Sequence, residues 1–223
     1  MRQIPLPIAA LPAPAFDNFL PGANASAIAH LESLSAPAAP VYLWGVSGSG
    51  KTHLMQALVH RFAQQGTRAG WFSAADPAPW ANDDAWGLIA IDHCDALDAG
   101  QQHAAFTLFV EAATRGVPLI ASGRVPPVDL PLREDLRTRL GWGHVFAVLP
   151  LSEPEARAAL RREADRRALF FSDDVMDYLL TRFARDLKHL MALLDRLDEF
   201  SLSTKRAITV PLLKQMLAEE GKG

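Results

Sequence analysis

Eight consecutive residues have the types and the spacing that bind phosphate. The run from Gly45 to Thr52 reads GVSGSGKT and fits the pattern GxxxxGKT. Glycines let backbone amides converge on phosphate oxygens, and the helix that follows offers its positive end. Lys51 is expected to reach the β- and γ-phosphates, and the Thr52 hydroxyl to hold Mg²⁺. The predicted nucleotide site consists of Gly45, Ser47, Gly48, Ser49, Gly50, Lys51, Thr52 and His53.

An acidic residue completes this pattern further along the chain. Asp92 ends the apolar run GLIAID, which is where phosphate-loop proteins place the carboxylate that orients Mg²⁺. Many ATPases have a second acid next to it that positions the attacking water, but here the next residue is His93. His93 or Asp95 is a candidate base, and both are equally well explained as surface loop residues. The sequence therefore predicts a nucleotide site with weak hydrolysis.

Other polar residues are weaker candidates. Ser122 follows an apolar run and is either a γ-phosphate sensor or an ordinary turn residue. Arg133, Arg137 and Arg139 lie in LREDLRTRLGWG, where arginines are usually solvated, although an arginine that reaches a neighbour's nucleotide is worth about 10³- to 10⁵-fold in rate. Arg185 begins an amphipathic helical pattern and could fold back onto the phosphates.

The elements that must position these residues alternate between strand and helix. Short apolar runs predict strands at 41–44, 68–74, 87–92, 117–123 and 144–151. Helical periodicity lies between them at 26–34, 52–65 and 101–115, with Gly66 and Gly116 as stop signals. Continuous apolar strands that alternate with helices predict a five-stranded parallel sheet covered on both faces.

The pattern changes after residue 151. Four helical segments follow, at 152–169, 172–184, 186–204 and 209–220, and Ser152 and Ser172 are placed as N-caps. We therefore predict a flexible tail (1–15), an α/β nucleotide-binding domain (16–151) and a small all-helical lid domain (152–223).

Composition limits the classes of function. The 223 residues carry 22 basic and 25 acidic side chains, so a dedicated DNA-binding domain, which is usually basic, is not expected. The single cysteine, Cys94, suits a reducing compartment, and no apolar run approaches the roughly 20 residues that span a bilayer. The expected location is the cytoplasm, without a membrane partner.

These motifs, in this order, resemble the AAA+ module of the DnaA branch. Residues 16–31 are similar to its adenine-side segment, 43–57 to its phosphate loop, and 136–143 to its arginine-finger segment. The sequence departs from DnaA in its short N-terminal tail and in stopping after the lid, without a helix-turn-helix domain. Any contact with DNA is therefore expected to be indirect.

A closer resemblance is to the Hda family of DnaA-related regulatory inactivators. It is carried by residues 184–217, which are similar to that family's lid, and by the N-terminal tail. In the tail, Gln3, Leu6, Pro7 and Ile8 resemble the motif with which such proteins dock into the hydrophobic pocket of the DNA polymerase III β sliding clamp.

The resemblance implies a function in the control of replication initiation. ADP, or ATP, occupies the phosphate loop with Mg²⁺ at Thr52 and Asp92, and Arg185 reaches it from the lid. Arg139 acts in trans on ATP bound to DnaA, so that initiation is suppressed while the clamp tethers the protein. Three alternatives stay open: an autonomous AAA+ ATPase such as a helicase loader, a non-catalytic DnaA-binding adaptor, and, least favoured, a small-molecule P-loop kinase. Self-association is also left open.

Overall fold

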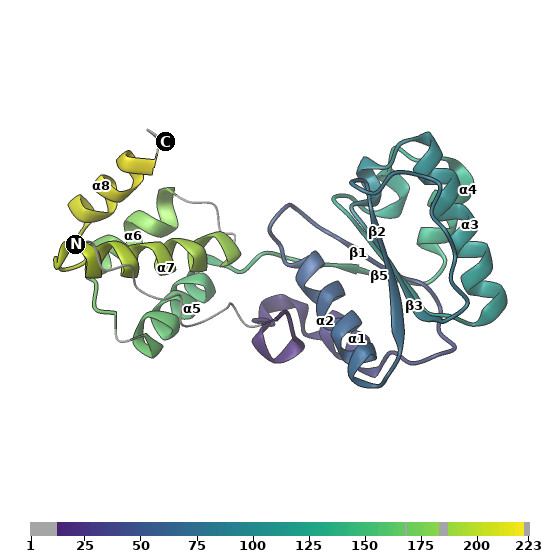
Figure 1. Cartoon of the computed structure of the whole chain (residues 1–223), viewed down its shortest axis with the longest axis horizontal. Helices are drawn as coiled ribbons and strands as arrows, with labels where there is room; N and C mark the ends of the chain where they lie inside the picture. The colour runs from purple at the N-terminus through teal and green to yellow at the C-terminus, as the bar shows by residue number, and fades with distance from the viewer. Residues whose placement is uncertain (1–12, 168, 183–186, 221–223) are drawn as a thin grey trace. The chain divides into compact units, whose positions relative to one another are not determined.

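The computed structural model describes residues 13–220 apart from residue 168 and residues 183–186. The chain separates into two compact units, and the boundary between them falls after Leu149. We call residues 13–149 the sheet unit and the part that begins at Pro150 the helical unit (Figure 1).

The sheet unit is built on five parallel strands, as the sequence predicts. They are β1 (Val41–Trp44), β2 (Arg68–Ser73), β3 (Trp86–Asp92), β4 (Leu119–Gly123) and β5 (His144–Ala147), arranged in the order β2-β3-β4-β1-β5. The central strand β4 is buried throughout, because helices cover both faces of the sheet. Since parallel strands end at the same edge, the residues that follow β1, β3 and β4 are brought together.

Four α-helices and four 3-10 turns surround this sheet. The helices are α1 (Ala25–Ser33), α2 (Lys51–Gln64), α3 (Ala99–Arg115) and α4 (Glu134–Gly141). The turns are η1 (Phe16–Asn18), η2 (Gly22–Asn24), η3 (Cys94–Ala96) and η4 (Pro127–Asp129). Helices α1 and α2 pack on one face of the sheet and α3 and α4 on the other, which gives the unit two apolar cores (Figure 1).

Two helix ends show why the chain changes direction where it does. Asp98 precedes α3 and accepts a hydrogen bond from the amide of Gln101 at 2.8 Å, while the Gln101 side chain accepts one from the amide of Asp98 at 2.9 Å. This reciprocal cap starts α3 at Ala99, two residues before the predicted start. Gly116 ends it in the left-handed conformation, with φ of 66°.

The helical unit contains α5 (Glu153–Arg166), α6 (Asp173–Arg182), α7 (Leu187–Thr204) and α8 (Val210–Glu220) among its described residues. The four segments match the predicted helices, and their apolar faces meet in a core that includes Leu179, Leu194 and Leu213. Ser152 caps α5 as expected and donates its hydroxyl to Glu155 at 2.6 Å.

Two expectations about the sheet unit need correction. Helix α4, which carries Arg139, has no counterpart among the predicted elements. The last strand ends at Ala147 and does not reach Leu151. The backbone amide and carbonyl of Leu149 form hydrogen bonds with the Asn24 side chain and not with a neighbouring strand, and Pro150 has no amide hydrogen to donate.

Candidate nucleotide-binding site

The loop between β1 and α2 contains two glycines in a backbone conformation that favours glycine. Gly48 and Gly50 have φ of 77° and 102°, a region that residues with a Cβ rarely adopt. Space is also limited at Gly50, because a Cβ there would lie 2.5 Å from the ring of Phe19. Gly50 is therefore needed for both conformation and packing, and Gly48 for its conformation.

Lys51 starts α2 and lies against this loop. The residue is 7% exposed, and its ammonium group donates hydrogen bonds to the carbonyl oxygens of Gly45 at 2.7 Å and Val46 at 2.9 Å. Burial lowers the pKa of Lys51, an effect that the nearby carboxylates of Asp92 and Asp95 oppose. The ammonium group of Lys51 thus lies at the edge of the loop, bound to two of its carbonyl oxygens.

A hydroxyl in the same loop has no partner among the described residues. Ser49 is 5% exposed, and its buried Oγ makes no hydrogen bond in that part of the chain. A buried hydroxyl normally finds a partner. Ser49 therefore fits a loop whose donors are completed by an anionic ligand.

Three side chains converge where β3 and β4 end. The Thr52 hydroxyl donates to Oδ2 of Asp92 at 2.7 Å, and the Ser122 hydroxyl donates to Oδ1 of the same carboxylate. Asp92 and Ser122 are 3% and 0% exposed. A hydroxyl and a carboxylate side by side are the oxygen ligands that Mg²⁺ takes next to a nucleotide, so Thr52 and Asp92 fit the predicted metal role. Ser122 lies in β4 and not in a turn, and its hydroxyl is bound to Asp92.

His93 follows in a left-handed conformation, with φ of 56°. Its amide donates to Oδ1 of Asp92 at 3.0 Å, and its ring Nδ1 lies 3.2 Å from Oδ2. Asp95, the other candidate base, forms an ion pair with Arg124 at 3.3 Å. Both side chains of the predicted pair are thus engaged with neighbours in this arrangement.

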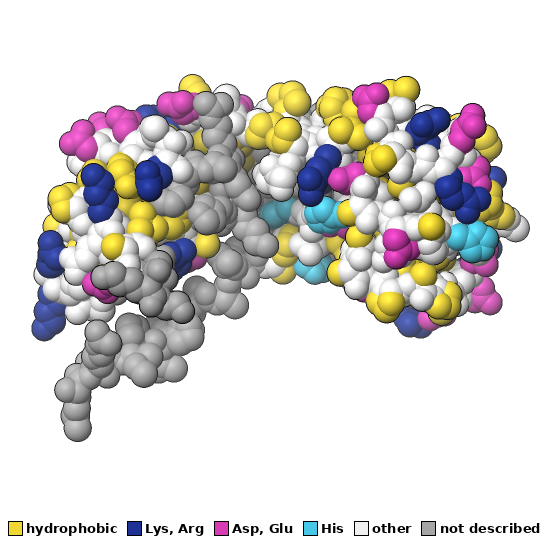
Figure 2. Space-filling view, turned by 90° about the horizontal axis from the view of Figure 1, so that it is seen from above, with side chains coloured by type: hydrophobic (Ala, Val, Ile, Leu, Met, Phe, Trp, Pro, Cys, Tyr) yellow, Lys and Arg dark blue, Asp and Glu magenta, His cyan; other side chains and the backbone are white. Residues whose placement is uncertain are grey.

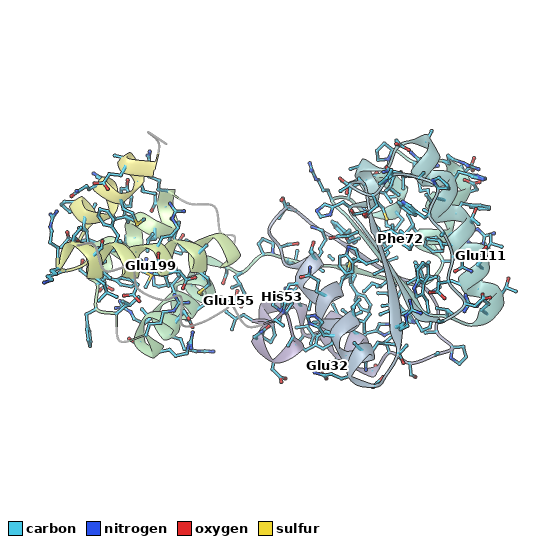
Figure 3. The ribbon with its side chains drawn as sticks, viewed as in Figure 1. Glu32, His53, Phe72, Glu111, Glu155 and Glu199 are labelled. Carbon is cyan, nitrogen blue, oxygen red and sulfur yellow. The ribbon has the colours of Figure 1, made fainter. Side chains whose placement is uncertain are left out.

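His53 lies in the first turn of α2 and binds the start of the described chain (Figure 3). Its Nε2 donates to the carbonyl of Ala15 at 3.0 Å, and Nδ1 of His60 donates to the carbonyl of Pro14 at 2.7 Å. The rings of His53 and Phe19 are 5.4 Å apart. The segment before the sheet is therefore attached to the helix that carries the phosphate loop, which the sequence analysis did not anticipate.

The other predicted site residues are distributed as follows. The loop, Asp92 and His53 lie around the start of α2, and Arg139 lies on a different helix of the same unit, α4. Arg185 of the predicted lid contact and the tail residues Gln3, Leu6, Pro7 and Ile8 lie outside the described residues.

Arg139 is partly buried between two aromatic rings. Its guanidinium carbon lies 4.8 Å from the ring centre of Phe106 and 5.3 Å from that of Trp142. Arg133, whose guanidinium carbon lies 5.7 Å from the centre of the same Phe106 ring, is instead paired with Asp135 at 2.6 Å. In the part of the chain that the structure describes, no carboxylate forms an ion pair with Arg139. Its positive charge is therefore held by aromatic faces and not neutralised.

A shallow groove adjoins this arginine. Its volume is about 500 Å³, and Val128 and Trp142 on its rim are 75% and 70% exposed. The lining residues are Pro127, Val128, Arg137, Thr138, Gly141, Trp142 and Val145. Figure 2 shows a surface on which basic and acidic side chains alternate, without a continuous basic patch on the face in view.

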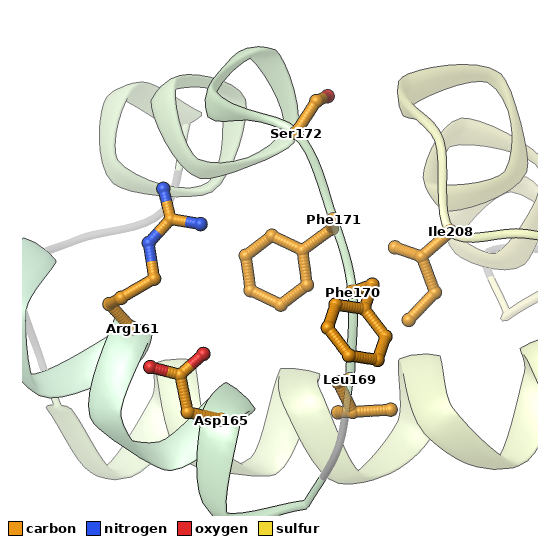
Figure 4. Close-up of a pocket in the computed structure, with 7 residues that line it drawn as sticks. All are labelled: Arg161, Asp165, Leu169, Phe170, Phe171, Ser172 and Ile208. Atoms are coloured by element: carbon orange, nitrogen blue, oxygen red, sulfur yellow. The ribbon is translucent and has the colours of Figure 1, made fainter.

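A second hollow, of about 260 Å³, belongs to the helical unit (Figure 4). It is lined by Arg161, Asp165, Leu169, Phe170, Phe171, Ser172 and Ile208. It has no glycine loop, so it does not compete with the sheet unit as a phosphate site. Among the described residues, no group of three histidine, cysteine or acidic side chains is arranged as a metal site, and no helix has the length and apolarity to cross a membrane.

Comparisons with known proteins match both parts of the chain. The family model of the bacterial DnaA ATPase domain matches residues 12–71, and that of the Hda lid domain matches residues 153–217. Domain III of DnaA from Thermotoga maritima aligns with a TM-score of 0.76 at 18% identity, over 94% of this chain and 97% of that one. A RuvB mutant from the same organism aligns with a TM-score of 0.66 at 15% identity, over 92% and 71%.

Longer initiator structures align over part of their length. AMPPCP-bound DnaA from Aquifex aeolicus gives a TM-score of 0.70 at 20% identity, over 84% of this chain and 66% of that one. A DNA replication initiation factor gives 0.69 at 19% identity, over 84% and 65%. This chain thus spans about two thirds of those proteins.

A parallel sheet with a phosphate loop, followed by a helical unit, defines a AAA+ protein. The two matched family models narrow this class, since one belongs to DnaA and the other to Hda. The chain is an Hda/DnaA-related AAA+ protein.

Proposed function

We propose that this protein is a nucleotide-bound regulator that inactivates the replication initiator DnaA. ADP occupies the phosphate loop, with Lys51 and the loop amides on its phosphates and, where Mg²⁺ is present, Thr52 and Asp92 as the residues that hold it. Such an ion neutralises phosphate charge. The support comes from the buried Lys51, the unpartnered Ser49 hydroxyl and the Thr52–Asp92 pair.

The nucleotide bound to this chain stabilises one conformation of the protein and is hydrolysed slowly. The Asp92 carboxylate accepts hydrogen bonds from Thr52, Ser122 and the His93 amide, while Asp95 is paired with Arg124. A general base needs a free lone pair within reach of the attacking water. Oδ1 of Asp95 is buried and has no hydrogen-bond partner among the described residues, so the case for slow hydrolysis rests on His93, which stands where many ATPases have a second acid.

Arg139 is the observation on which the proposal depends. A guanidinium that has no carboxylate partner among the described residues, and that contacts the rings of Phe106 and Trp142, is available to a γ-phosphate supplied by another protein. The exposed apolar side chains of Val128 and Trp142 give that partner a surface to cover. The partner is DnaA with ATP bound, and the result of the contact is its conversion to the ADP form.

The tail tethers the protein to the sliding clamp on newly copied DNA. Gln3, Leu6, Pro7 and Ile8 are the residues of this contact, and tethering raises the local concentration of the protein near DnaA. Contact with DNA is through the clamp. Loss of clamp pull-down by the double variant Gln3→Ala and Leu6→Ala, with Arg139 intact, is the result that the tether requires.

Arg139→Ala tests the central step. We expect it to reduce the stimulation of DnaA-bound ATP hydrolysis by about 10³-fold, or to DnaA's intrinsic rate, while clamp binding is unchanged. Arg133→Ala is the matched control, because Arg133 contacts the same Phe106 ring but is already paired with Asp135. Hydrolysis is measured with radiolabelled ATP on DnaA and clamp-loaded DNA. Full stimulation by Arg139→Ala would refute the arginine-finger role and favour a simple adaptor.

A further inference from the structure

Asn24 binds a distant backbone segment with both atoms of its amide. It lies at the end of η2, directly before α1, and is 2% exposed. Its Nδ2 donates to the carbonyl of Leu149 at 2.9 Å, and the amide of Leu149 donates to its Oδ1 at 2.8 Å. A buried side chain with both polar groups satisfied in this way has one well-defined position.

Leu149 is the last residue of the sheet unit. Val148, before it, is still part of the sheet, because its amide donates to the carbonyl of Trp44 at 2.7 Å. At Leu149 that pairing stops, and Pro150, which opens the helical unit, has no amide hydrogen. The Asn24 side chain thus takes the place of a neighbouring strand at the point where the chain leaves the sheet unit. We call Val148–Leu149 the exit segment.

The exit segment also touches the phosphate loop. A Cβ on Gly45, the first residue of the loop, would lie 2.3 Å from the carbonyl oxygen of Val148. The Gly45 amide is itself held by the carbonyl of Gly123 at 3.2 Å. Since the two backbones are in direct contact, a ligand that shifts or stiffens Gly45 acts on Val148, and Asn24 limits how the exit segment responds.

Asn24 has a second connection to the same site. Residues 16–24 lead from Phe19, whose ring lies against Gly50 of the phosphate loop, to Asn24 itself. The exit segment is therefore fixed from two sides, by the loop at Gly45 and by the segment that packs on the loop at Gly50. This arrangement is what a mechanical link between ligand and chain direction needs.

We propose that Asn24 is a positioning residue that couples a nucleoside diphosphate in the phosphate loop to the conformation of the exit segment. The inference rests on the proposed function in one respect, namely that a nucleotide occupies the loop. It adds the residue through which that nucleotide sets the conformation. Asn24 touches no phosphate and has no part in the chemistry at Arg139.

The test compares hydrogen–deuterium exchange of residues 146–153 in the full chain with and without ADP. In the unmodified protein, ADP is expected to slow exchange of this segment by about fivefold. Asn24→Asp keeps the acceptor for the Leu149 amide but places an oxygen against its carbonyl, so the ADP-dependent slowing is lost. ADP affinity, from calorimetry, changes by no more than about tenfold, the size of an ordinary coupling.

Gln101→Glu is the matched control. Gln101 is also a buried amide, at 5% exposed, and it donates to the carbonyls of Ala74 at 3.0 Å and Asp76 at 2.9 Å. The same amide-to-acid change there is a comparable disturbance of the sheet unit, away from the exit segment. It is expected to lower the melting temperature and to keep the ADP-dependent slowing, which separates coupling from general stability.

A second pair of variants covers the case in which Asn24→Asp does not fold. Leu149→Pro removes the backbone amide hydrogen that Oδ1 of Asn24 accepts, whereas Leu149→Ala keeps it. Because Leu149 is 49% exposed, shortening its side chain is a small disturbance. Of these two Leu149 variants, the proline variant is expected to lose the ADP-dependent slowing of exchange and the alanine variant to keep it. Retention of the slowing in Asn24→Asp or Leu149→Pro, or its absence in the unmodified protein, overturns the coupling and leaves the DnaA proposal intact. Failure of the unmodified protein to bind ADP overturns both.

Discussion

Gly50→Ala is the substitution for which the structure allows the most complete estimate. Gly50 precedes α2 with φ of 102°, and an added Cβ would lie 2.5 Å from Cε2 and 3.1 Å from Cζ of Phe19. Two separate costs follow: the left-handed backbone, and the overlap with an aromatic ring. A second glycine separates them, because Gly66 has φ of 78° and no atom within 4 Å of its added Cβ.

The magnitudes differ enough to be measured. The left-handed conformation costs about 1–2 kcal/mol for a residue with a Cβ, and alanine recovers about 0.4–1 kcal/mol by restricting the unfolded chain. Gly66→Ala is therefore expected to lower the free energy of unfolding by about 1 kcal/mol. Overpacking against Phe19 adds about 1–3 kcal/mol, which brings Gly50→Ala to about 2–4 kcal/mol.

Tryptophan fluorescence during urea denaturation is the appropriate assay. All five tryptophans lie between residues 13 and 149, so the signal follows the sheet unit alone. They are Trp44, Trp71, Trp80, Trp86 and Trp142. Phe19→Ala, combined with each glycine variant, completes a double-mutant cycle. The ring overlap predicts a coupling of about 1–3 kcal/mol between positions 19 and 50 and none between positions 19 and 66.

Two results would refute this reasoning. If Gly50→Ala costs no more than Gly66→Ala, the loop relaxes around the added methyl group, and the contact with Phe19 imposes nothing. If the double variant shows no coupling, the cost lies elsewhere. In either case the phosphate loop is not rigidly packed against residues 16–19, and the connection through Phe19 is lost.

Two further predictions concern the residues around Asp92 and Lys51. Ser122→Ala removes a buried donor to Asp92 and is expected to lower the free energy of unfolding, measured in urea, by about 1–2 kcal/mol. The exposed control Ser33→Ala should lower it by less than about 0.5 kcal/mol. Equal losses in the two variants would contradict a structural role for the Ser122–Asp92 hydrogen bond. Burial lowers the pKa of Lys51 below its ordinary 10.5, so the folded protein loses this proton at a lower pH than the unfolded chain. The contribution of Lys51 to the free energy of unfolding therefore rises with pH between the folded and unfolded pKa values. Over the same range the affinity for ADP is expected to fall, because the uncharged amine no longer attracts phosphate. Calorimetry between neutral pH and pH 10 checks this, with Lys51→Arg, which stays charged, as the control expected to show no such decline; a decline in both proteins would assign it to another group.

The sheet could be predicted from the sequence because its signals are local. The apolar runs at 41–44 and 87–92 are buried strands, and GxxxxGKT lies between a strand and a helix as the motif requires. Helix α4 was missed because its eight residues have a mean hydropathy far below that of a buried helix, and only Leu136 and Leu140 face the core. Short helices of this kind form because tertiary packing stabilises them.

The residues around the nucleotide site were only partly predictable. Asp92 could be predicted to lie near the loop because it ends a strand that follows the motif, and its carboxylate does accept a hydrogen bond from Thr52. The hydrogen bond from Ser122 depends on the adjacency of β3 and β4, which spacing alone does not give. Asn24 left no signal either, since its partner Leu149 is 125 residues away. A buried asparagine between a glycine turn and a helix is the kind of feature that only coordinates distinguish from an ordinary cap.

The two histidines of α2 have a mechanical consequence. His53, which shares the first turn of α2 with Lys51 and Thr52, donates to the carbonyl of Ala15, and His60, about two turns further along α2, donates to the carbonyl of Pro14. A tension applied to the chain ahead of Ala13 is therefore borne by α2 before it reaches the sheet. A partner that binds the N-terminus would therefore pull on the helix that begins with Lys51 and Thr52, so the proposed clamp anchor and the proposed nucleotide site act on the same helix.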